Sequence, residues 1–308
     1  MMEKFLYVFI HLALPLILLA DFFYRSSKSK IELFIKSFLY ISILYFLYSW
    51  GQWPLVGSYY LRYIIIAFII LVFLMSFKKF QSIEAIRPFG VLKNIMAIVT
   101  VLLLLLFLYM NYNVFKGRNY PLNGVELEFP LKNGSYYIAS GGSSKLINNH
   151  MRNHPNAQEY AIDINKLGRN KSVSKGILSN TNSDHYIFSD TIYCPCDGKI
   201  VEIRNNVKDN KFGSMNVTSK NGTGNFVNIF CETGVFVFIP HMKQFSVLVS
   251  EGMIIKKGDP LGLVGISGFS QEPHLHIQAA RYDVDSTLIG IPIYFNGTGL
   301  FRNDIYEN

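Results

Sequence analysis

The chain has 308 residues, enough for about two domains of ordinary size. Half of its residues are hydrophobic and 16% are charged, which excludes an intrinsically disordered chain. The net charge is +8, but residues 1–111 hold ten lysines and arginines against four acidic residues, so most of the excess lies there. Nucleic-acid binding requires a basic patch on a folded domain, and we therefore expect no nucleic-acid partner.

Four apolar segments in the first third of the chain predict membrane-spanning helices. They cover residues 5–23, 31–50, 59–77 and 92–110. Each has about the ~20 residues that a helix needs to cross the hydrocarbon core. The first lacks a small-residue cleavage site and is followed by three more spans, which excludes a signal peptide. We expect residues 1–111 to form a four-helix transmembrane anchor in the lipid bilayer.

The first span contains one ionisable residue, His11. Ionisable residues inside a membrane are candidates for function. The alternative is a neutral histidine packed between helices, and we favour it because the spans lack the paired charges of a transporter.

Basic residues in the connections between the spans predict the orientation. The 24–30 connection holds three lysines and arginines and the 78–93 connection holds four, whereas residues 51–58 hold none. Because connections rich in Lys and Arg remain on the cytoplasmic side, both basic connections should be cytoplasmic. We therefore expect a multi-pass protein of the cytoplasmic (inner) membrane whose carboxy-terminal domain lies in the extracytoplasmic space.

Beyond a polar linker at residues 112–124, residues 125–308 predict an all-β domain of mostly antiparallel sheets. Short β-like runs alternate there with glycine-rich turns, and no long stretch has the helical period. The clearest runs are Gly198–Ile203, Asn225–Phe230, Val235–Ile239, Leu261–Val264 and Leu275–Gln278.

The cysteine content excludes a disulfide framework. The chain has three cysteines, Cys194, Cys196 and Cys231, so one bridge is possible. We interpret Cys194 and Cys196 as buried thiols rather than a metal pair, because no second cysteine pair accompanies them.

The strongest chemical signal is a set of histidines and one aspartate. Residues i and i+2 of a strand face the same side, so His274 and His276 should lie side by side. Asp163 stands between apolar residues, where an unpaired carboxylate is costly, and His241 ends an apolar run. Two imidazole nitrogens and one carboxylate oxygen form a three-ligand zinc set with a position open for water.

The order of these elements resembles that of the M23 family of zinc metallopeptidases, the lysostaphin or LytM type. The resemblance extends from about residue 125 to residue 306 and leaves the four spans outside. It rests on Asp197–Val201, Gly224-Asn225, Pro240-His241-Met242, Val249–Asp259, Gly265–Gly268, Pro273–His276 and the Gly290–Gly297 tail.

This resemblance implies an M23 fold with an open groove, also described as a duplicated hybrid motif, and a bound Zn2+. It implies that Asp163 and His276 are zinc ligands and that His241 and His274 are the catalytic histidines beside the metal. A zinc-activated water can attack a peptide carbonyl, while a nearby histidine moves a proton or stabilises the oxyanion.

The remaining zinc ligand is the point at which the sequence departs from the family. Many members have a histidine four residues before the aspartate, where this chain has Glu159. A subgroup in which the ligand comes earlier resembles Gly141–His150, so His150 is the preferred ligand. His154 is the alternative, and Glu159 is third.

The resemblance, together with the expected topology, implies a membrane-anchored zinc metalloendopeptidase that acts outside the cytoplasmic membrane on peptidoglycan stem peptides or cross-bridges. The first alternative is a weak or inactive M23-like module that binds the cell wall or regulates other wall hydrolases. The second is a peptidase whose substrate is a protein. The presence of Asp163, His241, His274 and His276 favours an enzyme over a module that has lost its ligands.

Overall fold

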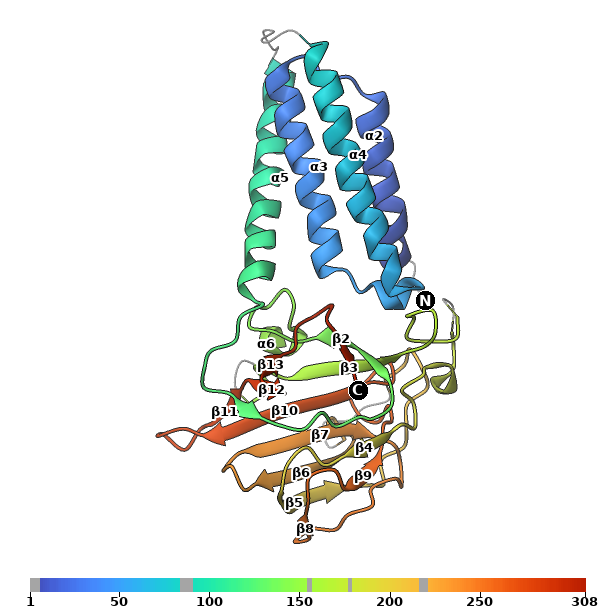
Figure 1. Ribbon diagram of the computed structural model, residues 1–308, viewed down its shortest axis with the longest axis vertical. Helices are drawn as coiled ribbons and strands as arrows, with labels where there is room; N and C mark the ends of the chain where they lie inside the picture. The colour runs from blue at the N-terminus through green and yellow to red at the C-terminus, as the bar shows by residue number, and fades with distance from the viewer. Residues whose placement is uncertain (1–5, 84–90, 154–156, 177–178, 216–220) are drawn as a thin grey trace. The chain divides into compact units, whose positions relative to one another are not determined.

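The computed structural model describes residues 6–83, 91–153, 157–176, 179–215 and 221–308. The chain divides into two compact units, Met1–Phe115 and Lys116–Asn308. The first unit is helical and the second consists mainly of β-strands (Figure 1).

The first unit confirms the expectation of four long apolar helices. Four helical segments are long and apolar enough to cross a membrane: Leu6–Tyr24, Lys30–Trp50, Tyr59–Gln81 and Ile95–Lys116. They contain α2 (Leu14–Tyr24), α3 (Lys30–Trp50), α4 (Arg62–Gln81) and α5 (Val91–Lys116), with shorter helical turns at Phe9–Ala13, Trp53–Val56 and Tyr59–Leu61. The side chain of Ser29 caps α3 by accepting a hydrogen bond from the backbone N–H of Glu32, which fixes where this helix begins.

Residues 112–116 correct the expected linker, because they continue α5 instead of leaving it. Near this end of the helix, the amide of Asn111 donates to the carbonyl of Ser42 on α3, and Val114 is buried. The following residues belong to the second unit. Tyr120 is buried there, and its hydroxyl donates to the carbonyl of Leu300 at 2.9 Å.

His11 packs as a structural histidine within the first unit. Its Nδ1 lies 2.7 Å from the carbonyl of Tyr7, and its Nε2 lies 3.2 Å from the backbone nitrogen of Gln52. Its ring meets the edge of Trp53 with 5.0 Å between centroids. Both ring nitrogens are therefore engaged, which supports the packing interpretation.

The second unit is built on one nine-stranded sheet, which confirms the expected mostly antiparallel β fold. The strand order is β14-β2-β3-β10-β7-β6-β5-β8, and β11 also pairs with β10. The bounds are β2 (Ser135–Ser140), β3 (Ile162–Leu167), β5 (Gly198–Arg204), β6 (Asn225–Cys231), β7 (Phe236–Met242), β8 (Ile254–Ile255), β10 (Leu275–Tyr282), β11 (Leu288–Ile291) and β14 (Ile305–Glu307).

Two smaller sheets and a short helix complete the unit. One sheet joins β1 (Val125–Glu126), β12 (Ile293–Phe295) and β13 (Thr298–Gly299), with β1 parallel to β12. The other pairs β4 (Thr191–Tyr193) with β9 (Pro260–Leu263). The helix, α6, comprises Asn149–Asn153. Positive φ angles at Asn296 and Gly297 form the tight turn between β12 and β13, as the Asn-Gly pair predicts.

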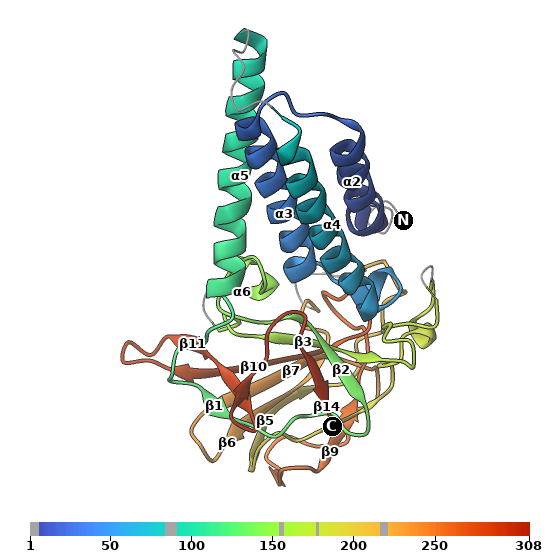
Figure 2. The ribbon, with the colours of Figure 1, turned by 45° about the horizontal axis from the view of Figure 1, so that its top comes forward.

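Alternation along the strands separates a buried face of the main sheet from a more exposed one. Val227 and Ile229 on β6, Val237 on β7 and Ile277 on β10 have no exposed surface and belong to one hydrophobic cluster. The residues between them point to the opposite face. Figure 2 shows β10 crossing the middle of this sheet between β3 and β7.

The cysteines form one bridge, between Cys196 at the start of β5 and Cys231 at the end of β6, with 5.9 Å between the Cα atoms. Cys194 is a free, buried thiol that donates to the carbonyl of Cys196. The expectation of two buried thiols is therefore confirmed for Cys194 and wrong for Cys196, because Cys196 is oxidised in the bridge.

Candidate metal centre

The pairing of β3 with β10 brings the aspartate and a histidine together. His276 lies directly opposite Asp163 in the antiparallel register, and such pairs point their side chains to the same face. β10 lies between two neighbours: Leu275–Ile277 pair with β3 along one edge, and Gln278–Ala280 pair with β7 along the other. Side chains of three adjacent strands can therefore converge on one face of the sheet.

Asp163 is the centre of the cluster. Its Oδ1 lies 3.0 Å from Nδ1 of His276, and its Oδ2 lies 2.8 Å from Nε2 of His150. Nε2 of His274 is 3.6 Å from Oδ1. Two groups of three residues have ligand atoms within 4.8 Å of one another: His150, Asp163 and His276, and His241, His274 and His276. Four histidines and one carboxylate thus share one site.

His150 reaches the site from helix α6, which the Asn148 side chain holds in place. Asn148 is fully buried, and its Oδ1 accepts the backbone N–H of His150 at 3.0 Å, as a helix cap does. Its Nδ2 donates to the carbonyls of Gly142 and Glu159, both at 2.9 Å. One amide therefore fixes the start of α6 and ties it to the segments on either side.

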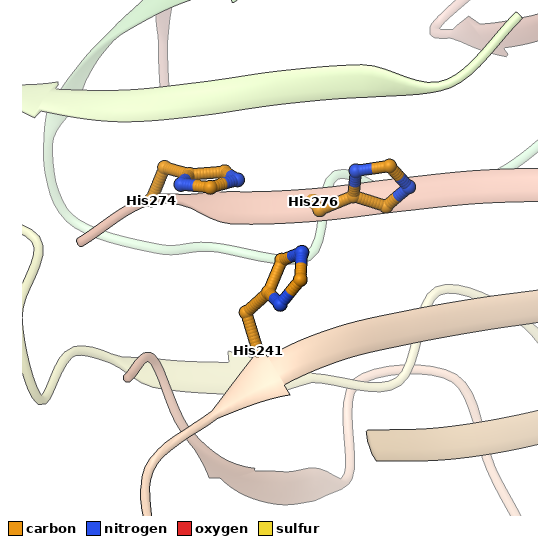
Figure 3. Close-up of side chains that lie close together, drawn as sticks. All are labelled: His241, His274 and His276. Carbon is orange, nitrogen blue, oxygen red and sulfur yellow. The ribbon is translucent and has the colours of Figure 1, made fainter. Parts of the chain in front are cut away.

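The other two histidines complete the cluster from the neighbouring strand ends. His274 precedes β10 by one residue and lies beside His276, while His241 extends toward both from the end of β7 (Figure 3). The ring centroid of His241 is 5.4 Å from that of His274 and 5.9 Å from that of His276. His241 has a φ of 61°, an uncommon conformation for a residue with a side chain, and such strain concentrates at functional sites.

A loop that requires glycine supports His241. The carbonyl of Ser267 lies 2.8 Å from Nδ1 of His241, and the hydroxyl of Ser267 accepts the N–H of Asn225. The next residue, Gly268, has a φ of 74°, and a Cβ there would collide with the backbone of Gly224. The two glycines allow the loops to approach closely enough for the carbonyl to hold the ring.

Hydrogen-bond acceptors fix the proton positions on two of the rings. Nδ1 of His241 faces the Ser267 carbonyl, and Nδ1 of His274 lies 2.9 Å from the Glu272 carbonyl. A carbonyl can only accept, so each neutral ring carries its proton on Nδ1 and leaves Nε2 as a lone pair. Oxygens of this kind orient the ligand histidines of metal sites.

The surroundings of His276 call for a cation. Its Nε2 lies 3.1 Å from Oε1 of Gln278. The Nε2 of Gln278 donates to the carbonyl of Ala157, so a flipped Gln278 amide would place its oxygen against that carbonyl oxygen. A neutral His276 has one proton but faces two acceptors, this Oε1 and Oδ1 of Asp163. With the proton on Nε2, the Nδ1 lone pair points at a carboxylate oxygen, and the two electron-rich atoms repel each other. A metal ion that binds both atoms removes this repulsion. The residues therefore fit a zinc ion.

The charges of the cluster suit a cation as well. Burial alone raises the pKa of Asp163, but the positive charge of His150 and His274 and the hydrogen bonds hold that pKa well below its usual range. Burial lowers the pKa of His276 and lowers that of His241 strongly. Burial also lowers the pKa of His150, but Asp163 more than offsets this, so the net shift is upward. The site thus combines an ionised carboxylate with two neutral imidazoles.

Among the other candidates for the remaining ligand, His154 lies outside the described residues. Glu159 belongs to neither metal-capable group. His185 is buried and stacks on Phe212 with 4.6 Å between ring centroids.

Gln278 and Asn148 are site residues that the sequence reasoning missed. Gln278 could have been found from the strand period, since it lies two residues after His276 on the same face of β10. Asn148 could have been found as a capping residue just before His150. The backbone carbonyls of Ser267 and Glu272 leave no signal in residue types.

One family model matches the chain. Residues 175–287 match the model described as Peptidase family M23. The matched segment contains His241, His274 and His276, whereas His150 and Asp163 precede it. No curated protein matches the chain.

Several solved structures are similar to part of the chain. A zinc-containing peptidase from Vibrio cholerae is 19% identical, with 54% of this chain and 39% of that chain covered and a TM-score of 0.33. The catalytic domain of lysostaphin from Staphylococcus simulans is 23% identical, with 36% and 78% covered and a TM-score of 0.25. The catalytic domain of a prophage-encoded M23 protein from Enterococcus faecalis is 16% identical, with 52% and 93% covered and a TM-score of 0.29.

Sequence identities and TM-scores this low do not support any argument about activity. The chain also spans only about two fifths of the length of the Vibrio cholerae peptidase. What the comparisons show is therefore the matched segment itself: residues 175–287, within the carboxy-terminal unit, match the model of peptidase family M23 and contain three of the histidines of the site.

Proposed function

We propose that the protein is a membrane-anchored zinc metalloendopeptidase that hydrolyses peptides of peptidoglycan on the extracytoplasmic side of the cytoplasmic membrane. One observation carries the proposal: two metal-capable groups share His276, one of them contains Asp163, and three of their histidines lie in the segment that matches the M23 model. The four apolar helices supply the anchor.

Nε2 of His150, the carboxylate of Asp163 and Nδ1 of His276 would hold the zinc ion. The first two atoms lie 2.8 Å apart, and the carboxylate is 3.0 Å from Nδ1 of His276. Zinc bound there would lower the pKa of a water molecule and polarise the peptide carbonyl. Because a ligand histidine must be neutral, the ion would displace the proton that Asp163 favours on His150.

His241 and His274 would handle the protons of the reaction. Each presents its Nε2 lone pair, because a backbone carbonyl holds the Nδ1 proton. Burial keeps the pKa of His241 low, so this ring is neutral and ready to accept a proton. A ring that accepts a proton from the attacking water can return it to the departing amine.

The location and the disulfide support an extracytoplasmic substrate. The basic connections 24–30 and 78–93 favour the cytoplasmic side, which puts the carboxy-terminal unit on the other side. The bridge between Cys196 and Cys231 suits an oxidising compartment. Peptidoglycan is the abundant peptide polymer on that side of a bacterial membrane.

The test uses the full-length protein in detergent, loaded with zinc, together with purified peptidoglycan. The wild-type protein should release new amino groups, and His274→Ala should release about a hundredfold fewer at the same zinc content. Binding of peptidoglycan without release of amino groups would favour the non-enzymatic module. Hydrolysis of unfolded casein but not of peptidoglycan would favour a protein substrate.

A further inference from the structure

The more exposed face of the main sheet continues from the histidine cluster across β7, β6 and β5. Residues directly opposite one another in a sheet point to the same face. Gln278 on β10 is opposite Phe238 on β7, which is opposite Asn228 on β6, which is opposite Glu202 on β5. These four residues form one row, the Gln278–Glu202 row, that begins beside His276.

Exposure increases along this row. Gln278 is buried against His276, Phe238 and Asn228 are half-buried, and Glu202 is exposed. Strands lie about 4.8 Å apart, so Asn228 is roughly 10 Å from Gln278 and Glu202 roughly 14 Å. An extended peptide advances about 3.3 Å per residue, so the row spans about three to four residues of a bound peptide.

Asn228 has an unused hydrogen-bond acceptor. Its Oδ1 is buried and has no partner among the described residues. A buried polar atom without a partner costs free energy, and such an atom in a native protein calls for an explanation such as a bound water, ion or ligand. The carboxylate of Glu202, its neighbour in the register, forms no ion pair with any described residue.

Aromatic rings flank this pair of acceptors. Phe238 lies opposite Asn228, and Phe226, two residues before Asn228 on β6, packs against Phe238 with 4.9 Å between the ring centroids. Arg204 covers the ring of Phe226 at 5.1 Å, which shows that a cation is accommodated on this face. On the far side, Phe230 and Phe236 pack with 4.9 Å between centroids.

A carboxylate, an amide oxygen and aromatic ring faces all favour one kind of ligand group, a cation with N–H donors. A neutral peptide N–H would satisfy Asn228 but would not use Glu202. Arg204, the nearest cation along β5, lies over the ring of Phe226 and donates to the hydroxyl of Thr223. Lys199, opposite Phe230 and Ile254, forms no ion pair with Glu202 among the described residues.

We propose that Asn228 and Glu202 form a subsite that binds a positively charged amino group on one arm of the peptide substrate. The subsite is continuous with the metal centre through Gln278 and Phe238. This inference rests on the proposed function and extends it, because it predicts that peptides with a free amine near the scissile bond are preferred.

The test compares two probes on the full-length, zinc-loaded protein in detergent. The probes are soluble peptidoglycan fragments with free amines and the same fragments acetylated with acetic anhydride. The wild-type protein should hydrolyse the free-amine fragments with a kcat/KM roughly tenfold or more above that of the acetylated ones, because a charged hydrogen bond is lost on acetylation. Fluorescence anisotropy of labelled fragments gives the same comparison for binding.

Two variants test whether Glu202 and Asn228 cause the preference for free-amine fragments. Glu202→Gln and Asn228→Leu should reduce kcat/KM and affinity for the free-amine fragments while leaving the acetylated ones nearly unchanged. Glu232→Gln is the control: it removes the same charge from a residue just after the end of β6, and this variant should keep the preference for free-amine fragments. Since Glu202 is exposed, its substitution does not threaten folding, and thermal unfolding of each variant checks this.

The outcomes separate this inference from the function on which it rests. Equal hydrolysis and equal binding of both probes by the wild-type protein would overturn the subsite and leave the peptidase intact. Absence of hydrolysis would overturn the peptidase, and the binding comparison would still decide the subsite. Equal losses on both probes in the variants would also contradict it, because they would indicate a general disturbance of the sheet.

Discussion

At the scale of single residues, the site depends on oxygen acceptors that orient the imidazole rings through hydrogen bonds. The Ser267 and Glu272 carbonyls orient His241 and His274, and the Gln278 amide orients His276. In the proposed mechanism, these contacts divide the histidines by function. Rings that face Asp163 closely can bind metal, while His241 and His274 keep a lone pair for protons.

The first prediction separates metal binding from proton transfer. His276→Ala should lose zinc and activity together, because it removes a ligand that lies 3.0 Å from Asp163. His241→Ala should retain zinc and lose about 10²- to 10⁴-fold in turnover. Zinc analysis and peptidoglycan hydrolysis on the same samples make the comparison. Wild-type turnover in His241→Ala would refute its assigned role.

The second prediction concerns Gln278, which orients His276. Gln278→Leu removes the oxygen that holds the Nε2 proton, and zinc affinity should fall about 10- to 100-fold. Competition with a chelator of known affinity measures the change, and the exposed Gln271→Leu serves as the control. Unchanged affinity in Gln278→Leu would show that the amide does not orient the ligand.

The sequence predicted part of the site at this scale. Strand periodicity predicted that His274 and His276 lie together, and burial cost singled out Asp163. His150 could be proposed only from the family resemblance, because nothing in its local sequence links it to a strand 13 residues away. The positive φ of His241 arises where the end of β7 meets the neighbouring loops, and no local pattern predicts it.

At the scale of elements, β10 organises the site because it lies between β3, which carries Asp163, and β7, which carries His241. The strand itself was predictable from the alternation in Leu275–Gln278, as were β5 and β6. Its partners were not, because pairing depends on segments more than a hundred residues apart. Helix α6 is too short to have a detectable period, so its existence became visible only in the fold.

The third prediction tests the cap of α6. Asn148→Asp keeps the oxygen that accepts the His150 N–H but loses the amide that donates to the carbonyls of Gly142 and Glu159. Two buried carbonyls then lack a partner, and stability should fall by about 1–3 kcal/mol. Urea unfolding followed by circular dichroism measures this. Zinc affinity should also fall, because His150 is carried by this helix.

Asn180→Asp provides the matched control outside the site. The same chemical change there should leave zinc affinity unaltered. If Asn148→Asp were as stable as the wild-type protein and bound zinc equally well, the capping network would not position His150.

At the scale of the whole molecule, the change in composition near residue 111 corresponds closely to the division into two units. The helical unit could be predicted because each span has the length and hydropathy of a membrane helix. The end of α5 was placed too early, since Asn111 and Val114 add polar and apolar contacts that hydropathy alone does not register. The pairing of the cysteines could not be deduced, because three cysteines allow three different bridges.

The fourth prediction concerns the disulfide of the carboxy-terminal unit. Cys231→Ser opens a bridge between residues 35 positions apart and should lower stability by about 2–4 kcal/mol. Urea unfolding measures the loss, and thiol titration of the unfolded, unreduced wild-type protein should find only the Cys194 thiol. Detection of all three thiols in protein isolated without reductant would contradict the bridge.

The measurement that tests the account most directly is the zinc content of the purified full-length protein, with His150→Ala and His154→Ala beside the wild type. The account predicts about one zinc ion per chain, lost in His150→Ala and retained in His154→Ala. A folded wild-type protein that binds no zinc would contradict the metallopeptidase. Loss of zinc in His154→Ala alone would contradict the ligand set of His150, Asp163 and His276.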